Sequence, residues 1–353
     1  MAFANTLRPG VFSQYTVSSL YGAGRSRQYA ALLAPCDSGA LSAPRWAESY
    51  AQGAALLADD TVGAALTALR LLFVGGVSRV WLAALPPEPA ASDYQAAMAL
   101  LKGQQNLYAV VCATDDEEAL AEVKASVLVA SQNQRERIAF CGFADPETAP
   151  AAAQALDSER MVLVCPGGLP AGQSGGHGPL LAAAALAAAV LTLEDPAASL
   201  SGYTLPGLDL LETTLTDQQV ETLLAAGITP LEQVGGAVQC VRALTTRTTT
   251  GGAADRSFAP VNTTLIIDHV MTAVRGTLLL LLRGAKSTLQ SYNAVASQVI
   301  VLLSEKQAQG IITGFDGPAV AAHPDDPSIC VVELSFGVAY AVNQIHIKTH
   351  VLV

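Results

Sequence analysis

Apolar runs of strand length alternate with helix-like segments in the first half of the chain, and this alternation limits the possible folds more than any other feature. The expected strands are residues 29–34, 77–85, 108–112, 137–143 and 161–164. The expected helices between them are residues 61–73, 93–101, 116–132, 146–156 and 180–193. Strands separated by single helices are typical of a layered domain with a mostly parallel sheet. We therefore expect an α/β fold.

The pattern changes after residue 195. Thr216 and Gln219 form a capping-box pattern that predicts a short helix, which Gly227 would close. The threonine-rich residues 238–250 predict a strand. The remaining expectations are two long helices (264–282 and 289–309), a strand (311–315), a linker (316–327) and a terminal strand pair (329–340 with 343–353).

Charge and composition exclude several classes of protein. Hydrophobic residues make up 51% of the chain and charged residues 14%, which is too apolar for a disordered protein. The net charge of −11 argues against a general nucleic-acid binder. A surface so poor in charge would be adhesive in a monomer, so we expect an oligomer. The six cysteines are dispersed without a C-x-x-C pair and are expected to be reduced.

The acidic residues are unevenly distributed. Residues 46–239 hold 7 basic and 22 acidic residues. Residues 1–45 hold four arginines against one aspartate, and residues 240–290 hold six basic residues against two acidic ones. No signal peptide is visible, and the longest apolar runs, 179–193 and 277–282, are shorter than the roughly 18 residues of a membrane span. We expect neither membrane insertion nor nucleic-acid binding.

Candidate catalytic patterns are weak. Gly172-Gln-Ser174-Gly-Gly resembles the nucleophile loop of chymotrypsin-like proteases, but no histidine precedes Ser174. The same glycine-rich loop, residues 166–179, could cradle phosphate, although it lacks the Lys-Ser/Thr pair of a P-loop. His346 and His350 would share a strand face and are more simply explained as an exposed face. We expect no catalytic, cofactor-binding or metal-binding residue; the alternative is an α/β hydrolase-like or nucleotide-binding enzyme that uses the loop.

Both chain ends alternate like strands. Near the start of the chain, one face of the expected strand would carry Val11, Tyr15 and Val17. The other face would carry Phe12 among polar residues. One face of the last segment would carry Ile345, Ile347, Thr349, Val351 and Val353. A terminal strand leaves backbone groups unpaired unless it joins a sheet, either in its own subunit or in a neighbour's by β-augmentation.

Five segments in order resemble the contractile tail sheath proteins of myophages, prophages and R-type bacteriocins. They are Leu7-Arg-Pro-Gly-Val-Phe, Leu72-Phe-Val-Gly-Gly-Val-Ser-Arg-Val, Arg137-Ile-Ala-Phe-Cys-Gly-Phe with Ser158-Glu-Arg-Met-Val-Leu-Val, Val241-Arg-Ala-Leu-Thr-Thr-Arg-Thr, and Val331-Val-Glu-Leu-Ser-Phe-Gly-Val-Ala-Tyr-Ala-Val-Asn-Gln-Ile-His-Ile. The segment from Val241 is the most specific match. The chain departs from the family in its high alanine content and its lack of large insertions.

The resemblance implies a structural protein and not an enzyme. Copies would stack as six-membered rings around an inner tube and contract to drive the tube through a cell envelope. The implied domains are an N-terminal extended arm (1–25), an outer, subtilisin-like α/β sheath domain (26–240), an inner α+β sheath domain (241–327) and a C-terminal β arm (328–353). The particle would be a phage tail, a bacteriocin or another contractile injection system, assembled in the bacterial cytoplasm.

The implied partners are other copies of the chain, the inner tail tube protein, and baseplate and tail terminator proteins. The residues expected to exchange strands between sheath subunits are Val11, Phe12, Tyr15, Val17, Ile345, Ile347, Val351 and Val353. The basic segments are expected to face the tube and the acidic middle to face outward. The candidates for tube contact are Arg275, Arg283, Lys286 and Lys306; alternatively, these cations pair with neighbouring sheath subunits.

Overall fold

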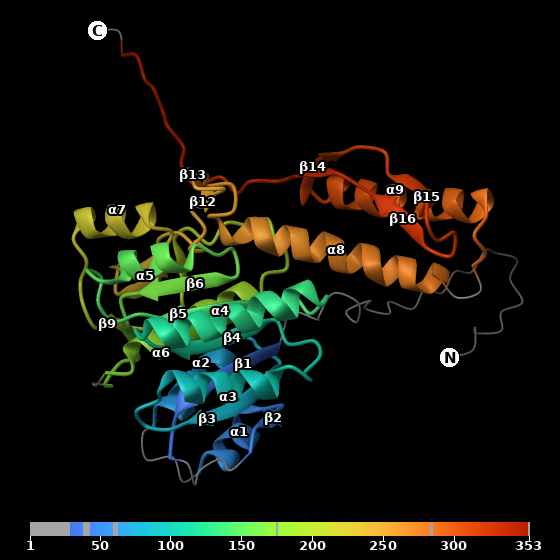
Figure 1. The fold of residues 1–353 in the computed structure, drawn as a ribbon. Coiled ribbons are helices and arrows are strands. Elements are labelled where there is room, and N and C mark those ends of the chain that lie inside the picture. Colours follow the sequence, from blue (N-terminus) through green and yellow to red (C-terminus); the bar gives the residue numbers. More distant parts are fainter. Residues whose placement is uncertain (1–28, 38–42, 59–62, 174–175, 283–284, 352–353) are drawn as a thin grey trace, which may run out of the picture.

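A nine-stranded sheet forms the centre of the molecule in the computed structural model, which describes residues 29–37, 43–58, 63–173, 176–282 and 285–351 (Figure 1). The strand order is β2-β3-β1-β4-β5-β6-β10-β11-β8, and the strands from β3 to β10 run parallel. Their bounds are β1 Tyr29–Pro35, β2 Arg45–Ala47, β3 Arg79–Leu85, β4 Ala109–Ala113, β5 Ile138–Gly142, β6 Met161–Cys165, β8 Tyr203–Thr204, β10 Thr229–Val234 and β11 Ala237–Cys240. The expected α/β fold with a mostly parallel sheet is confirmed.

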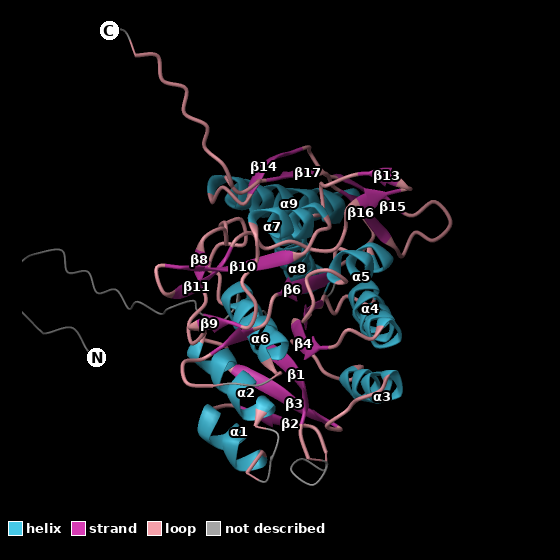
Figure 2. Ribbon diagram, turned by 90° about the vertical axis from the view of Figure 1, so that its left-hand side faces the viewer, coloured by secondary structure: helices cyan, strands magenta, loops and turns pink. Residues whose placement is uncertain are grey.

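Helices cover both faces of this sheet (Figure 2). One face packs against α1 (Tyr50–Leu56), α2 (Ala64–Val74) and α6 (Gly178–Leu191). The other face packs against α3 (Ala91–Leu101), α4 (Glu117–Gln132), α5 (Ala149–Leu156) and α7 (Asp217–Ala225). Every residue of β5 and β6 is buried, as expected for parallel strands covered on both sides.

The helix α6 is apolar on all sides because it has no solvent-facing side. All of its 14 residues are buried, between the sheet and α2. Gly142 in β5 permits the close approach, since a Cβ at this position would lie 1.9 Å from the carbonyl oxygen of Pro179. The high alanine content of this segment therefore reflects tight packing of a helix against a sheet.

One expectation for residues 216–250 is confirmed and one is corrected. Thr216 and Gln219 do form a capping box at the start of α7. The predicted continuous strand over residues 238–250 is wrong: β11 ends at Cys240, and β12 (Thr249–Thr250) pairs only with β13 (Ala253–Ala254). Threonine hydroxyls between these strands bond to backbone carbonyls of other segments, which replaces ladder pairing.

The C-terminal part consists of two long helices and short strand pairs. The helices are α8 (Val261–Leu282) and α9 (Leu289–Ala308). The antiparallel pairs are β14 (Ile312–Phe315) with β17 (Phe336–Val338), and β15 (Ala319–Ala322) with β16 (Cys330–Glu333). A fourth two-stranded sheet among the described residues joins β7 (Gly168–Leu169) to β9 (Leu210–Leu211) in the α/β part.

These pairings overturn two expectations. The predicted linker 316–327 contains β15, which forms an antiparallel pair with β16. The predicted pairing of residues 329–340 with residues 343–353 is wrong within this chain, because β16 and β17 pair with β15 and β14 instead. The described end of the chain, residues 341–351, has no strand and extends away from the body (Figure 1).

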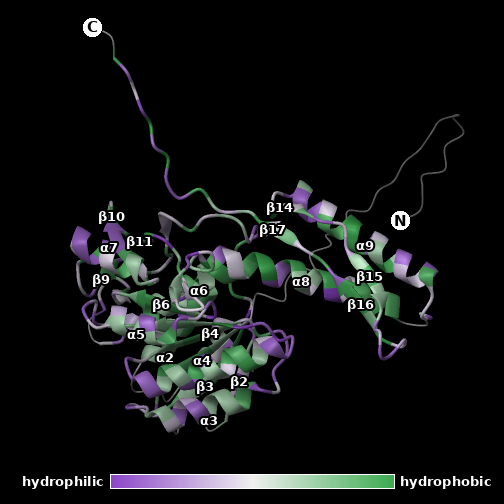
Figure 3. Cartoon of the chain, turned by 45° about the horizontal axis from the view of Figure 1, so that its top comes forward, coloured by the Kyte–Doolittle hydropathy of each residue, from purple (hydrophilic) through white to green (hydrophobic). Residues whose placement is uncertain are grey.

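The helix α8 is long and apolar enough to cross a membrane by length and composition alone. Its first half is instead part of the core, where Val261, Leu265, Ile266 and Val270 are buried. Its second half extends beyond the sheet and packs on α9 (Figure 1). Figure 3 shows how apolar this helix is along its length.

Candidate functional site

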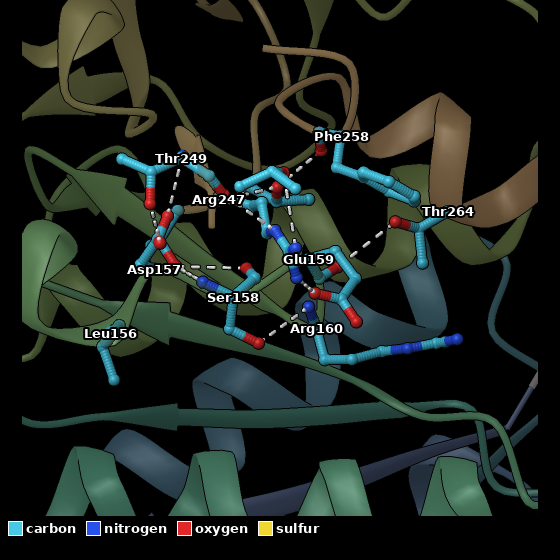
Figure 4. A network of polar contacts seen from close by, with 12 residues as sticks. Leu156, Asp157, Ser158, Glu159, Arg160, Arg247, Thr249, Phe258 and Thr264 are labelled. Carbon is cyan, nitrogen blue, oxygen red and sulfur yellow. Dashed lines mark hydrogen bonds and ion pairs between the residues drawn. The ribbon is translucent and has the colours of Figure 1, made fainter. Parts of the chain in front are cut away.

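The turn between α5 and β6 joins the sheet to the C-terminal part through a network of polar contacts (Figure 4). Asp157 begins the network in a left-handed conformation, with φ of 34°. Its carboxylate accepts hydrogen bonds from the backbone nitrogens of Thr248 (2.8 Å) and Thr249 (3.1 Å), and from the Thr249 hydroxyl. Desolvation opposes ionisation here, but these hydrogen bonds outweigh it and lower the pKa of Asp157.

The next two residues continue the network. The Thr246 hydroxyl donates to the carbonyl of Ser158 and accepts from its backbone nitrogen, both at 3.1 Å. Glu159 forms an ion pair with Arg247 at 2.9 Å, and its carbonyl accepts a hydrogen bond from Thr264 in α8. The threonines that looked like a strand therefore fasten residues 245–249 to the start of β6.

Arg160, Asp268 and Tyr108 form the most buried part of this joint. The Arg160 guanidinium binds the Asp268 carboxylate in bidentate fashion, at 2.6 and 2.8 Å. Tyr108 donates a third hydrogen bond, at 2.6 Å, to the same carboxylate. The side chains of Arg160 and Asp268 are only 12% and 4% exposed. Burial alone would lower the pKa of Arg160, but the hydrogen bond and charge of Asp268 raise it.

This arrangement fixes α8 to the sheet. Tyr108 precedes β4, Arg160 precedes β6 and Asp268 lies in the first half of α8. An additional ion pair, between Arg275 and Glu136, connects the middle of α8 to the segment before β5. The free half of α8 therefore projects in a direction that the α/β part determines, and it carries α9 with it.

The glycine-rich loop does not present an open phosphate cradle. The Glu212 carboxylate accepts a hydrogen bond from the backbone nitrogen of Gly178, at 3.0 Å, where α6 begins. A Cβ on Gly178 would lie 2.2 Å from Glu212 Cδ, so the carboxylate is packed tightly against the helix N-terminus. A carboxylate of the chain thus occupies the position where an anion would bind. Ser174 lies outside the described residues.

No group of histidine, cysteine and acidic residues within the described ranges could hold a metal ion. His346 interacts with the side chain of Gln344 at 3.3 Å on an exposed segment. Five of the cysteines are buried and Cys330 is exposed.

The predicted strand-exchange residues fall into two groups. Val11, Phe12, Tyr15, Val17 and Val353 lie outside the described residues. Ile345, Ile347 and Val351 are 82%, 85% and 77% exposed, on a segment without a strand partner in the described part of the chain. Asn343, just before them, accepts hydrogen bonds from Ser199 (3.2 Å) and Ser201 (2.8 Å), which hold the start of this segment against the α/β part.

The four predicted tube-contact residues lie in different environments. Arg275 is engaged by Glu136 within the chain, and Arg283 lies outside the described residues. Lys286 is exposed in the connection between α8 and α9, and Lys306 donates to Gln309 in the last turn of α9.

Sequence reasoning missed the exposed leucines around this connection: Leu279, Leu280, Leu282 and Leu289. Their crowding at the end of a long apolar helix was the available signal.

The matching family model and the matching solved structures describe the same kind of protein. Residues 88–246 match the model of the phage tail sheath protein central domain. A search of the curated proteins gives no match. Among solved structures, a chain of the anti-feeding prophage (AFP) baseplate matches with a TM-score of 0.73 and 14% identity, covering 99% of this chain and 100% of that one.

Two further structures share the fold. The AFP helical sheath in its contracted state matches with a TM-score of 0.72 and 14% identity, over 98% of this chain and 99% of that one. A tail sheath protein of Listeria innocua matches with a TM-score of 0.71 and 14% identity, over 88% and 92%. Residues 88–246 thus match the model of the phage tail sheath protein central domain, and almost the whole length of the chain has the fold of solved tail sheath proteins.

Proposed function

We propose that this chain is the structural subunit of a contractile tail sheath, of the kind found in phage tails and related injection systems. The observation that carries the proposal is the match of nearly the entire chain to the AFP helical sheath, together with the family match of residues 88–246. The subunit works by assembly and rearrangement, not by catalysis. The Glu212 carboxylate at the start of α6 adds to the case against the hydrolase-like or nucleotide-binding alternative.

In the proposed particle, copies stack as six-membered rings around an inner tube and meet baseplate and terminator proteins at the ends. The terminal arms pair with strands of neighbouring copies. The exposed apolar residues Ile345, Ile347 and Val351 support this role, because each would bury apolar surface when the segment joins a neighbour's sheet. The arm and domain boundaries, and the subtilisin-like outer domain, remain part of this proposal.

Contraction requires no nucleotide in this proposal. Extended and contracted sheaths are two packings of one subunit, and the difference in their free energies drives the change. The joint around Arg160 and Asp268 supports a subunit that moves as one body, because it fixes α8 to the sheet at several points. The particle forms in the bacterial cytoplasm and uses neither nucleic acid nor membrane insertion of the sheath.

Electron microscopy of the purified protein tests this function. We expect rings, tubes or rods in negative stain. A monodisperse small species with hydrolase activity that Ser174→Ala abolishes would favour the enzyme instead.

Two basic residues are proposed to contact the inner tube: Lys286, in the α8–α9 connection, and Lys306, in the last turn of α9. Charge reversal of Lys286 and Lys306 to Glu should prevent co-assembly with the tube protein while tube-free sheath still polymerises. Exposed ion pairs are individually weak and sensitive to salt. A sheath that must release its tube on contraction is therefore expected to hold the tube through several such pairs.

Co-sedimentation of sheath with tube at low and high salt is the measurement for this variant. Arg45→Glu, an exposed charge reversal on β2, is the matched control. Normal, salt-insensitive loading of tube by the lysine variant would contradict an electrostatic contact.

A further inference from the structure

Arg242 lies in residues 241–248, the segment most similar to tail sheath proteins. The contacts of the described residues do not account for its side chain. Its neighbours Thr245, Thr246 and Arg247 all bond to other segments of the chain. The Arg242 side chain forms no hydrogen bond or ion pair with any of the described residues, and its Nε is buried without a hydrogen-bond partner. The side chain as a whole is half-buried.

The surroundings of Arg242 make this cation costly. Arg256 lies close enough to repel it, and the Arg256 guanidinium is directed at the C-terminal carbonyls of α7, Leu224 and Ala225. Burial, and then the charge of Arg256, lower the pKa of Arg242. A partly desolvated cation with a buried, unsatisfied donor destabilises a chain unless an anion meets it.

A carboxylate is the chemical group that fits this position. A guanidinium presents parallel donors that match two carboxylate oxygens, and Arg242 retains its donors for such a contact. The chain itself is rich in carboxylates, with 30 acidic residues against 19 basic ones. The ion pairs among the described residues engage only Glu48, Glu136, Glu159 and Asp268. Others remain exposed, such as Glu117 and Glu118 at the start of α4.

We propose that Arg242 receives an acidic side chain from a second copy of this chain in the assembled sheath. The inference rests on the proposed function, since it requires copies to pack together. A second copy is favoured over the tube because α7, β12 and β13 lie on the side of the start of α8, at the far end of that helix from the α8–α9 connection that holds Lys286, one of the two proposed tube contacts (Figure 1).

The test compares Arg242→Gln with the full-length unaltered chain and with Arg45→Gln, which removes an exposed cation of β2. We expect the midpoint of thermal unfolding of unassembled Arg242→Gln to be unchanged or raised, because a repelled, half-buried charge is removed. Polymerisation without tube should require at least about tenfold more protein, the factor that corresponds to losing one good ionic contact. Arg45→Gln should polymerise normally.

A second variant keeps the proposal testable if Arg242→Gln does not fold. Arg242→Lys keeps the charge and loses the bidentate geometry, so its polymerisation should be impaired without loss of stability. A lowered unfolding midpoint in both variants would assign Arg242 to the fold of its own subunit and overturn the proposal. A defect that appears only when tube is present would identify the tube as the partner and overturn the assignment to a second copy.

The behaviour of the unaltered chain distinguishes a failure of the Arg242 contact from a failure of the sheath function. If it polymerises and Arg242→Gln polymerises equally well, the role of Arg242 is wrong and the sheath function stands. If the unaltered chain never polymerises, the proposed function fails, and the inference fails with it.

Discussion

Replacing Asp268 by alanine is expected to lower the free energy of unfolding by about 3–5 kcal/mol. The substitution would leave the Arg160 guanidinium and the Tyr108 hydroxyl without the carboxylate that all three hydrogen bonds share. Removing one partner of a buried ion pair costs more than the pair contributes, because the remaining charge stays desolvated. Urea denaturation followed by circular dichroism measures the loss.

Two control variants test the cause of this loss. Tyr108→Phe deletes one hydrogen bond to a charged group and should cost only about 1.5–3 kcal/mol. The double substitution Arg160→Met with Asp268→Leu replaces the pair by apolar side chains and should recover most of the stability. If Asp268→Ala loses less than about 1 kcal/mol, the contact is not the one that fixes α8 to the sheet.

Deletion of residues 341–353 is expected to abolish polymerisation and leave a folded monomer with nearly unchanged stability. The described part of this segment forms no strand with its own subunit, and its apolar side chains are among the most exposed of the chain. The deletion removes the hydrogen bonds of Asn343 to Ser199 and Ser201, which are exposed and contribute little. Sedimentation and negative-stain microscopy measure assembly, and thermal unfolding measures the fold.

Ile347→Pro is the sharper variant of the same experiment. Proline removes one backbone donor and fixes φ, which disrupts a strand ladder but changes nothing else that the structure shows at this exposed position. Ile347→Val is the matched control, because it keeps the donor and a β-branched side chain. A truncated chain that unfolds or aggregates would mean that the segment completes its own subunit's core.

Local patterns in the sequence were enough to predict most of the elements between β3 and α6. Leucines at helical spacing and short apolar runs predicted the helices and strands from β3 to β6, and α6, close to their observed bounds, but not the short strand β7. They succeed because covered parallel strands are apolar on both faces and amphipathic helices repeat every 3.6 residues. The capping box at Thr216 succeeded for the same local reason, since all of its partners lie within four residues.

Local patterns failed where a side chain's partner is distant in sequence. Residues 238–250 look like a strand because threonine favours strands, but their hydroxyls bond to Ser158 and Phe258. Arg275 was a candidate for contact with the tube and is instead held by Glu136, 139 residues away in its own chain. The same limit applies to Glu212, whose carboxylate covers the N-terminus of α6 from a different loop.

The sequence by itself thus determined the α/β class, the two long C-terminal helices and the resemblance to sheath proteins, because these depend on the order and period of neighbouring residues. Only the tertiary structure decided where α8 is attached, how β14 to β17 pair, and that Arg242 lacks a partner among the described residues. Those outcomes depend on which segments meet in space. Hydrogen bonds and ion pairs act over a few ångströms, so a chain's periodicity carries no record of partners 100 residues apart.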